Sequence, residues 1–373
     1  MQTRGAKARL GTPMALSGEL EAALACARER FGTWPDIRGF GFGRKFLQRQ
    51  RCFRKSRGVG PLCLHVFVGR KLAEPPPGYR LPKRLYYRVP GRTARKSIEL
   101  DVVALGKVEQ QDGTRRLTSA GPLCVGRLFG FEPPPAGGAP GQYEIGTAGA
   151  LVSDEEENVY AVSSGHVFIN TGAPSWNRPS SNLLFHLVGR TWALPPESLQ
   201  PASLGVPPTL VDGMAMRLPA AAAPDPSLSG WPRLFRGEFA SDADVALALS
   251  RPADGAFVWA EREGASTQIP VDLVGHGHFC EIPDLCPGVR NIYPYFWTYH
   301  FPQDTGGNPW TVTLGGDSGS GLYVPDANDP RVPKLLGFHF AIHRGDGNAW
   351  IGTAIPAENF IAATLGEARL HWT

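Results

Sequence analysis

The chain has 373 residues, of which 42% are hydrophobic and 19% are charged, and it contains 45 Gly and 35 Pro. This length allows two or three folding units, and the glycine and proline content argues against a helical bundle. No stretch approaches the roughly 20 apolar residues of a membrane span, and residues 1–30 contain no apolar run of signal-peptide length. We therefore expect a soluble, cytoplasmic protein with no membrane contact, whose six cysteines are reduced.

The net charge of +4 conceals an uneven distribution. Residues 1–100 contain 22 Lys and Arg against 6 Asp and Glu, whereas the remainder contains 16 against 28. This asymmetry indicates two domains with different surfaces. Basic clusters at 44–45, 49–57 and 92–96 make nucleic acid a conceivable partner of the first domain. Because no nucleic-acid motif frames these clusters, we favour a solvated face, or one that docks on the acidic remainder.

A small α+β domain is predicted over residues 1–110. Its helix runs from Ser17, which can cap it, to Phe31, and apolar residues recur at helical spacing within it. Strands are predicted at 40–45, 63–68 and 98–104, because these segments are apolar, rich in β-branched residues, or alternate apolar with small residues. The Pro-rich segment 75–96 is predicted to be loop.

From Ile145 onward the sequence changes to short apolar strands separated by turns. Residues 147–152 and 159–162 predict a hairpin, and Ser-Ser-Gly-His166 follows its second strand. Residues 110–116 are interpreted as a linker and 132–141 as a loop. The hairpin therefore ends directly before a histidine.

The segment 314–322 reads Leu-Gly-Gly-Asp-Ser-Gly-Ser-Gly-Leu. Glycine at this density indicates a sharply turning backbone whose N–H groups can point at a ligand. Ser318 in such a turn is well placed to act as a nucleophile, with backbone amides beside it to hold an oxyanion. The same string is also compatible with a simple hairpin turn, so its interpretation depends on the rest of the chain.

A serine nucleophile needs an imidazole to accept its proton and a carboxylate to orient that imidazole. His166 is the candidate imidazole. Asp244 is the candidate carboxylate, in the segment Asp242 to Leu249, which is predicted to be a strand. Asp242 is its rival, and Asp212, in Leu-Val-Asp-Gly-Met, is the third candidate.

Together, the hairpin with its histidine, Asp-Val-Ala-Leu and Gly-Asp-Ser-Gly resemble the chymotrypsin-like (trypsin-fold) serine proteases, most closely their intracellular and bacterial branches. The resemblance covers residues 119–373 and implies two antiparallel β-barrels, at roughly 119–252 and 265–373. It implies that His166 is the general base and that Ser318 attacks the peptide carbonyl. It also implies that Asp244 orients His166, because Asp-Val-Ala-Leu matches the family pattern better than the surroundings of Asp242 or Asp212.

The resemblance further implies that the backbone N–H groups of Gly316 and Ser318 form the oxyanion hole. The sequence departs from the family in lacking a cysteine after the histidine, where Phe168 and Ile169 stand. It also shows no cleavage site that would release a new N-terminus to pair with Asp317.

Three residues bear on specificity. Val312, six residues before Ser318, stands where trypsin-like relatives have the base of the P1 pocket, so a preference for Arg or Lys has no support. Thr313 and His339 resemble the pair with which glutamyl endopeptidases and certain viral proteases bind P1 Glu or Gln. A hydroxyl and an imidazole N–H are suitable donors for such a side-chain oxygen. The alternative is that His339 is only a structural strand histidine.

We expect no cofactor and no metal. His276, His278, Cys280 and Cys286 are the alternative, as four zinc ligands, but their spacing matches no established zinc motif.

The sequence thus predicts a serine endopeptidase that acts on protein or peptide substrates and cuts after Glu or Gln. Its N-terminal domain would regulate the activity or recruit the substrate. Two alternatives remain: a catalytically silent protease-fold scaffold, and a protease switched by nucleic acid bound to residues 1–100.

Overall fold

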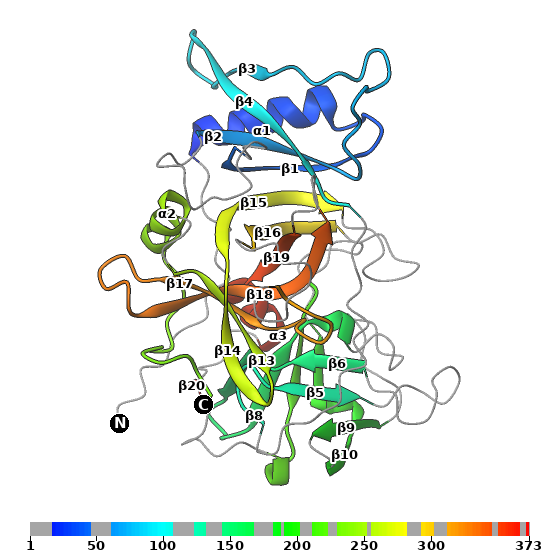
Figure 1. The fold of residues 1–373 in the computed structure, drawn as a ribbon, viewed down its shortest axis with the longest axis vertical. Helices are drawn as coiled ribbons and strands as arrows, with labels where there is room; N and C mark the ends of the chain where they lie inside the picture. The colour runs from blue at the N-terminus through cyan, green and yellow to red at the C-terminus, as the bar shows by residue number, and fades with distance from the viewer. Residues whose placement is uncertain are drawn as a thin grey trace.

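The structure is a computed structural model that describes residues 17–45, 61–106, 123–131, 144–167, 182–187, 190–201, 211–222, 230–251, 255–281, 292–301, 312–344, 350–365 and 371–372. These residues form mainly β-strands in sheets whose strand pairs are antiparallel except for β2 with β4, and a small helix-containing unit lies at the N-terminus (Figure 1). The predicted fold class is confirmed. The longest described helix has 14 residues, and no helix in the described ranges combines the length and hydropathy needed to cross a membrane.

The N-terminal unit consists of α1 (Gly18–Phe31), β1 (Ile37–Arg44), β2 (Leu62–Val68), β3 (Arg84–Arg88) and β4 (Arg95–Ala104). Helix α1 begins after Ser17, whose side chain accepts a hydrogen bond from the Leu20 N–H. The buried face of α1 packs on apolar side chains of all four strands. The predicted helix and the three predicted strands are therefore present.

Strand β3 lies within the segment that was predicted to be loop. Leu85 and Tyr87 are buried, and the residues between and around them are exposed. This alternation lets a short strand pair with β4 at the edge of the sheet despite the neighbouring prolines. The predicted linker at 110–116, the loop at 132–141 and the basic cluster at 49–57 lie outside the described residues.

The first β unit contains β5 (Leu128–Phe131), β6 (Glu144–Thr147), β7 (Ala150–Ser153), β8 (Val159–Ser163), β9 (Leu183–Leu187), β10 (Arg190–Leu194), β11 (Leu199–Pro201) and β12 (Met214–Arg217). The C-terminal β20 (His371–Trp372) pairs with β7. The described strands form two sheets, in the orders β10-β9-β5-β6 and β11-β12-β8-β7-β20. Buried aromatic and methionine side chains from both sheets share one core.

The second β unit contains β13 (Phe257–Arg262), β14 (Ala265–Pro270), β15 (Asp272–Glu281), β16 (Ile292–His300), β17 (Gly321–Pro325), β18 (Pro333–Arg344) and β19 (Trp350–Pro356). Helix α2 (Asp242–Ser250) precedes it and α3 (Ala357–Leu365) follows it. One buried cluster contains Val152 and Val162 of the first unit together with Phe338 and Phe360 of the second. The two β units are therefore packed against each other.

The N-terminal strands continue the sheet of the second unit. The order of the eleven strands is β14-β13-β17-β18-β19-β16-β15-β1-β2-β4-β3, and β1 pairs antiparallel with β15 (Figure 1). At this junction Gly41 lies opposite Gly277 and Gly43 opposite Gly275. A Cβ atom on Gly41 would lie 2.0 Å from the His276 carbonyl oxygen, so the close approach requires glycine. The boundaries at 110 and 119 stay predictions.

Candidate active site

The β7–β8 hairpin positions His166. The Asp154 side chain organises the turn, since it accepts hydrogen bonds from the backbone N–H groups of Glu156 and Asn158 and from the Tyr160 hydroxyl. Strand β8 then ends at Ser163, and a single 3₁₀ turn carries His166. Residue 166 thus lies at the end of a well-anchored strand, as the sequence predicts.

Ser318 lies in two successive tight turns. The Asp317 N–H donates to the Leu314 carbonyl, and the Ser320 N–H donates to the Asp317 carbonyl. Gly316 and Gly319 have φ of 90° and 96°, which favour glycine. A Cβ atom on Gly319 would lie 2.2 Å from the Ser163 Oγ, so glycine also allows this loop to pack against the end of β8.

The structure connects the side chains of Asp212, His166 and Ser318 by hydrogen bonds. His166 Nε2 lies 2.8 Å from Ser318 Oγ, and His166 Nδ1 lies 2.6 Å from Asp212 Oδ2. The backbone N–H of His166 also donates to Asp212 Oδ1, at 2.7 Å. Asp212 is fully buried, whereas the His166 side chain is 19% exposed. This geometry allows the imidazole to accept the serine proton while the carboxylate fixes its tautomer.

Strand pairing explains why Asp212 occupies this position. Strand β12 pairs antiparallel with β8, and Met214 lies opposite Ser163. His166 comes three residues after Ser163, and Asp212 comes two residues before Met214. In an antiparallel pair these two extensions leave the sheet at the same end. The register therefore places the carboxylate beside the imidazole.

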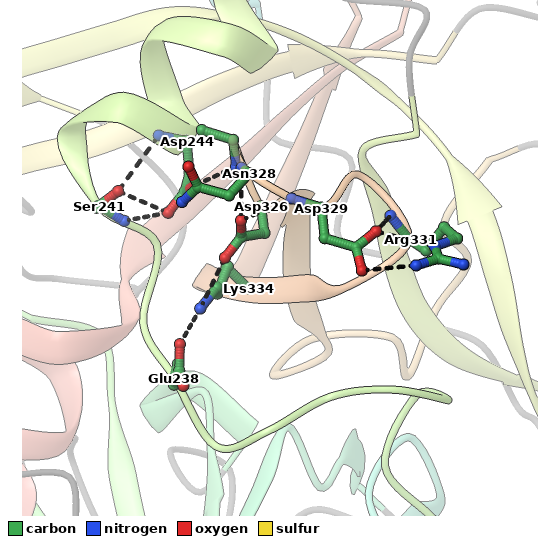
Figure 2. Close-up of polar contacts among 9 residues, drawn as sticks. Glu238, Ser241, Asp244, Asp326, Asn328, Asp329, Arg331 and Lys334 are labelled. Carbon is green, nitrogen blue, oxygen red and sulfur yellow. Dashed lines mark hydrogen bonds and ion pairs between the residues drawn. The ribbon is translucent and has the colours of Figure 1, made fainter.

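The prediction that Asp244 orients His166 disagrees with the structure. Residues 242–250 form helix α2 rather than the predicted strand, and Asp244, the third residue of this helix, completes a capping box with the N-cap residue Ser241. One oxygen of Asp244 accepts from the Ser241 N–H and Oγ–H (Figure 2). The other oxygen accepts from the Ala327 N–H. Asp244 therefore anchors the helix to the β17–β18 turn, while Asp242 lies in the first turn of the same helix.

The same turn is held by an ion-pair network, which Figure 2 shows. Lys334 on β18 pairs with Glu238 and with Asp326, and Asp326 Oδ1 accepts hydrogen bonds from the backbone N–H groups of Asn328 and Asp329. These carboxylates all have structural partners. The cluster around Asp244 is therefore a brace for the hairpin.

The candidate oxyanion hole lies beside Ser318. The carbonyl oxygens of Gly316 and Ser318 both accept hydrogen bonds from Thr147, through its hydroxyl and its N–H respectively. Within the described residues, no hydrogen bond uses the N–H of Gly316 or of Ser318 as its donor. Two backbone amides predicted for the oxyanion hole are thus held next to the nucleophile in a fixed loop.

Asp317 has a buried partner within the chain. Arg262 on β13 donates from Nη1 to Asp317 Oδ1 at 2.9 Å and from Nη2 to Oδ2 at 2.6 Å, and both side chains are buried. Arg262 Nη2 also donates to the Val312 carbonyl. This two-pronged contact fixes the loop that carries Ser318. Asp317 is therefore paired with an arginine of the same chain.

His339 lies on β18 directly beside the nucleophile loop. Its backbone carbonyl accepts from the Gly319 N–H, and its N–H donates to the Ser320 carbonyl. Its Nδ1 lies 2.5 Å from the Tyr299 hydroxyl. Burial, with the nearby Asp317 charge, raises the pKa of Tyr299 well above its usual value, so this hydroxyl stays protonated. Burial lowers the pKa of His339 to about 4, so the ring is neutral near pH 7.

The other two specificity candidates, Thr313 and Val312, are also buried, at 2% and 3% exposure. They lie in the segment that leads into the Ser318 turns. Val312 contributes its carbonyl to Arg262 and offers no acidic side chain.

The predicted alternative, a metal site on β15, is not assembled in the described residues. The rings of His276 and His278 lie 4.8 Å apart and pack on Phe42 and Tyr295. Cys280 belongs to the hydrophobic core, and Cys286 lies outside the described ranges. Within those ranges, the groups of metal-ligating atoms that converge do not include these residues.

No protein-family model and no curated protein matches the sequence. Among solved structures, the chain is similar to the Nocardiopsis protease (TM-score 0.37, 8% identity, covering 67% of this chain and 98% of that one). It is also similar to Thermobifida fusca protease A (TM-score 0.35, 10% identity, 67% and 99%). A third similar structure is a glutamic acid specific serine protease that utilizes a novel histidine triad in substrate binding (TM-score 0.34, 15% identity, 59% and 90%). The roles of individual residues in this chain are inferred from its own geometry.

Proposed function

We propose that the protein is a serine endopeptidase in which Ser318 is the nucleophile, His166 the general base and Asp212 the residue that orients the base. The observation that carries this proposal is the row of contacts from Asp212 through His166 to Ser318, at 2.6 and 2.8 Å. The N–H groups of Gly316 and Ser318 stabilise the oxyanion that forms when Ser318 Oγ attacks a peptide carbonyl. His166 then returns the proton to the leaving amine.

A fluorophosphonate probe, which reacts with activated serines, tests this proposal. The purified chain should be labelled at Ser318, and Ser318→Ala should not be labelled. The buried Ser320, two residues away, offers a matched control. Ser320→Ala keeps Asp212, His166 and Ser318, so this variant should still react. Absence of labelling in the folded wild-type protein would favour a catalytically silent scaffold instead.

For specificity, we propose that Thr313 and His339 bind a P1 Glu or Gln side chain. A neutral imidazole N–H and a threonine hydroxyl can each donate a hydrogen bond to a carboxylate or amide oxygen. The lack of an acidic residue at Val312 argues against Arg or Lys.

A peptide-library cleavage profile should therefore show preference for Glu or Gln at P1. His339→Leu should lose this preference yet still react with the fluorophosphonate. His343→Leu, another buried histidine of the same strand, is the control and should keep the preference. Cleavage after Arg, Leu or Ala alone would contradict the specificity proposal and leave the endopeptidase proposal intact.

The N-terminal unit is proposed to regulate the protease or to recruit its substrate. Its support is the continuous sheet, in which β1 joins β15, and β15 is connected through β16 and β19 to β18, the strand of His339. The unit is thus physically joined to the wall of the candidate P1 pocket.

A further inference from the structure

A second group of chemically reactive side chains lies in the N-terminal unit. Cys63 and His65 are two residues apart on β2 and therefore point to the same face of the sheet. Asp101 lies on β4, beside His65 in the parallel register. One ligand atom from each residue lies within 4.8 Å of the other two. We propose that Cys63, His65 and Asp101 bind a divalent transition metal ion of the zinc type.

The donor set selects this class of ion. A thiolate, an imidazole and a carboxylate are all zinc ligands, whereas calcium and magnesium prefer oxygen donors only. Zinc bonds of about 2.0–2.3 Å place tetrahedral ligand atoms roughly 3.5 Å apart. Side-chain rotations that draw the three atoms together by about 1 Å therefore complete the site. A water molecule takes the fourth position.

His65 already has the outer contact that ligating histidines use. Its Nε2 lies 3.1 Å from the Arg44 carbonyl oxygen, so the Nε2–H donates there and the lone pair of the neutral ring lies on Nδ1. A metal-bound histidine almost always donates its other ring N–H to a carbonyl or carboxylate.

The glycines of β1 leave room on this face. Gly41 lies opposite His65, and Gly43 lies opposite Cys63. A Cβ atom on Gly43 would lie 2.4 Å from His65 Cε1, because the imidazole ring extends over this residue. The Cys63 thiol donates to the Gly43 carbonyl at 3.3 Å. Strand β1 thus contributes only backbone to the pocket, and the ligands come from β2 and β4.

The negative charges of the Cys63 thiolate and the Asp101 carboxylate would balance the two positive charges of a divalent ion. Metal binding replaces the thiol proton of Cys63, which passes to solvent, and the resulting thiolate and the Asp101 carboxylate together neutralise the ion. The Lys45 ammonium group interacts electrostatically with both Cys63 and Asp101, and it is paired with Glu99 at 3.0 Å. Asp101 is only partly buried, which gives the ion a route from solvent.

Cobalt(II), a spectroscopic substitute for zinc, tests the site in the reduced full-length chain. We expect about one equivalent to bind and to produce a thiolate-to-cobalt charge-transfer band. Cys63→Ser should abolish this band. Cys280→Ser, which alters an equally buried cysteine on β15, should retain it. Wild-type protein without the band, or Cys63→Ser with the band, would overturn the proposal.

A second variant guards against a folding defect in Cys63→Ser. Asp101→Asn keeps the size of a partly exposed side chain, so its fold should persist. We expect it to weaken zinc binding by at least about tenfold in a competition titration with a chelator. An unchanged zinc affinity in this variant would contradict ligation by Asp101. Neither experiment depends on protease activity.

Discussion

At the scale of single residues, two aspartates compete for the imidazole of His166, and their neighbours decide between them. Asp212 is fully buried and bonds to both the ring and the backbone of His166. In Asp244, one carboxylate oxygen accepts a hydrogen bond from the N-terminus of α2, and the other accepts one from the Ala327 N–H. The hydrogen bonds of Asp244 within the described residues thus go to the helix cap and to the β17–β18 turn, and none goes to His166.

This difference predicts that the same Asp-to-Asn substitution affects catalysis at position 212 and stability at position 244. Asp212→Asn should lower kcat by about 10⁴-fold, because the amide favours the wrong tautomer of His166. Asp244→Asn should leave kcat nearly unchanged and should lower the free energy of unfolding by about 1 kcal/mol through the weakened helix cap. Steady-state kinetics and urea unfolding measure both. A large fall in kcat for Asp244→Asn alone would reverse the two roles.

At the scale of elements, the junction between β1 and β15 depends on facing glycines. Gly41 opposes Gly277, and Gly43 opposes Gly275, so four residues without side chains meet where the N-terminal unit joins the second β unit. The obstacle to a side chain at Gly41 is the His276 backbone carbonyl, which cannot rotate away. The alternation Phe-Gly-Phe-Gly therefore indicates that β1 is a strand whose glycines pack closely against the backbone of β15.

Gly41→Ala should therefore destabilise the junction. We expect a loss of about 1–3 kcal/mol in the free energy of unfolding, because the added methyl group overpacks the site. Hydrogen exchange should quicken in β1 and β15 before it does in β8 or β12. Gly18→Ala is the matched control, since a Cβ atom there meets no atom within 4 Å. Equal stability of the two variants would show that the junction tolerates a side chain.

At the scale of the whole molecule, histidines are unusually concentrated in the interior. Among the residues whose burial the structure describes, six histidines are buried: His65, His276, His278, His300, His339 and His343. Burial is the main cause that lowers each pKa, to about 4 for His65, His278, His339 and His343, to about 3 for His300, and well below the usual value for His276. All six are neutral in the native protein near pH 7, whereas they titrate normally once the chain unfolds.

The protein should consequently lose stability as the pH falls through the range from about 6.5 to 4. In this range the unfolded chain binds more protons than the native chain, so acid favours unfolding. Each histidine contributes a slope of up to about 1.4 kcal/mol per pH unit. Urea unfolding at pH 7.5 and at pH 5 measures the combined effect of the six histidines on the free energy of unfolding. His278→Phe should reduce the pH dependence of this free energy by the contribution of one histidine. An unfolding midpoint that does not change with pH would contradict this expectation.

Local patterns in the sequence were sufficient for much of the molecule. Helix α1, strands β1, β2 and β4, the β7–β8 hairpin and the glycine-rich turn around Ser318 all follow from nearby residues, because capping, alternation and turn formation are short-range effects. The capping box from Ser241 to Asp244 is also local, and it indicates a helix where the apolar run after Asp244 led to the prediction of a strand.

Only the tertiary structure decided which carboxylate reaches His166. That choice depends on the register of β12 against β8, two strands that are separated by some fifty residues of chain. The same holds for the partnership of Arg262 with Asp317 and for the joining of β1 to β15. Residue type and spacing determine which side chains could perform the chemistry. Long-range strand pairing selects among them, because burial and register are properties of the assembled sheets.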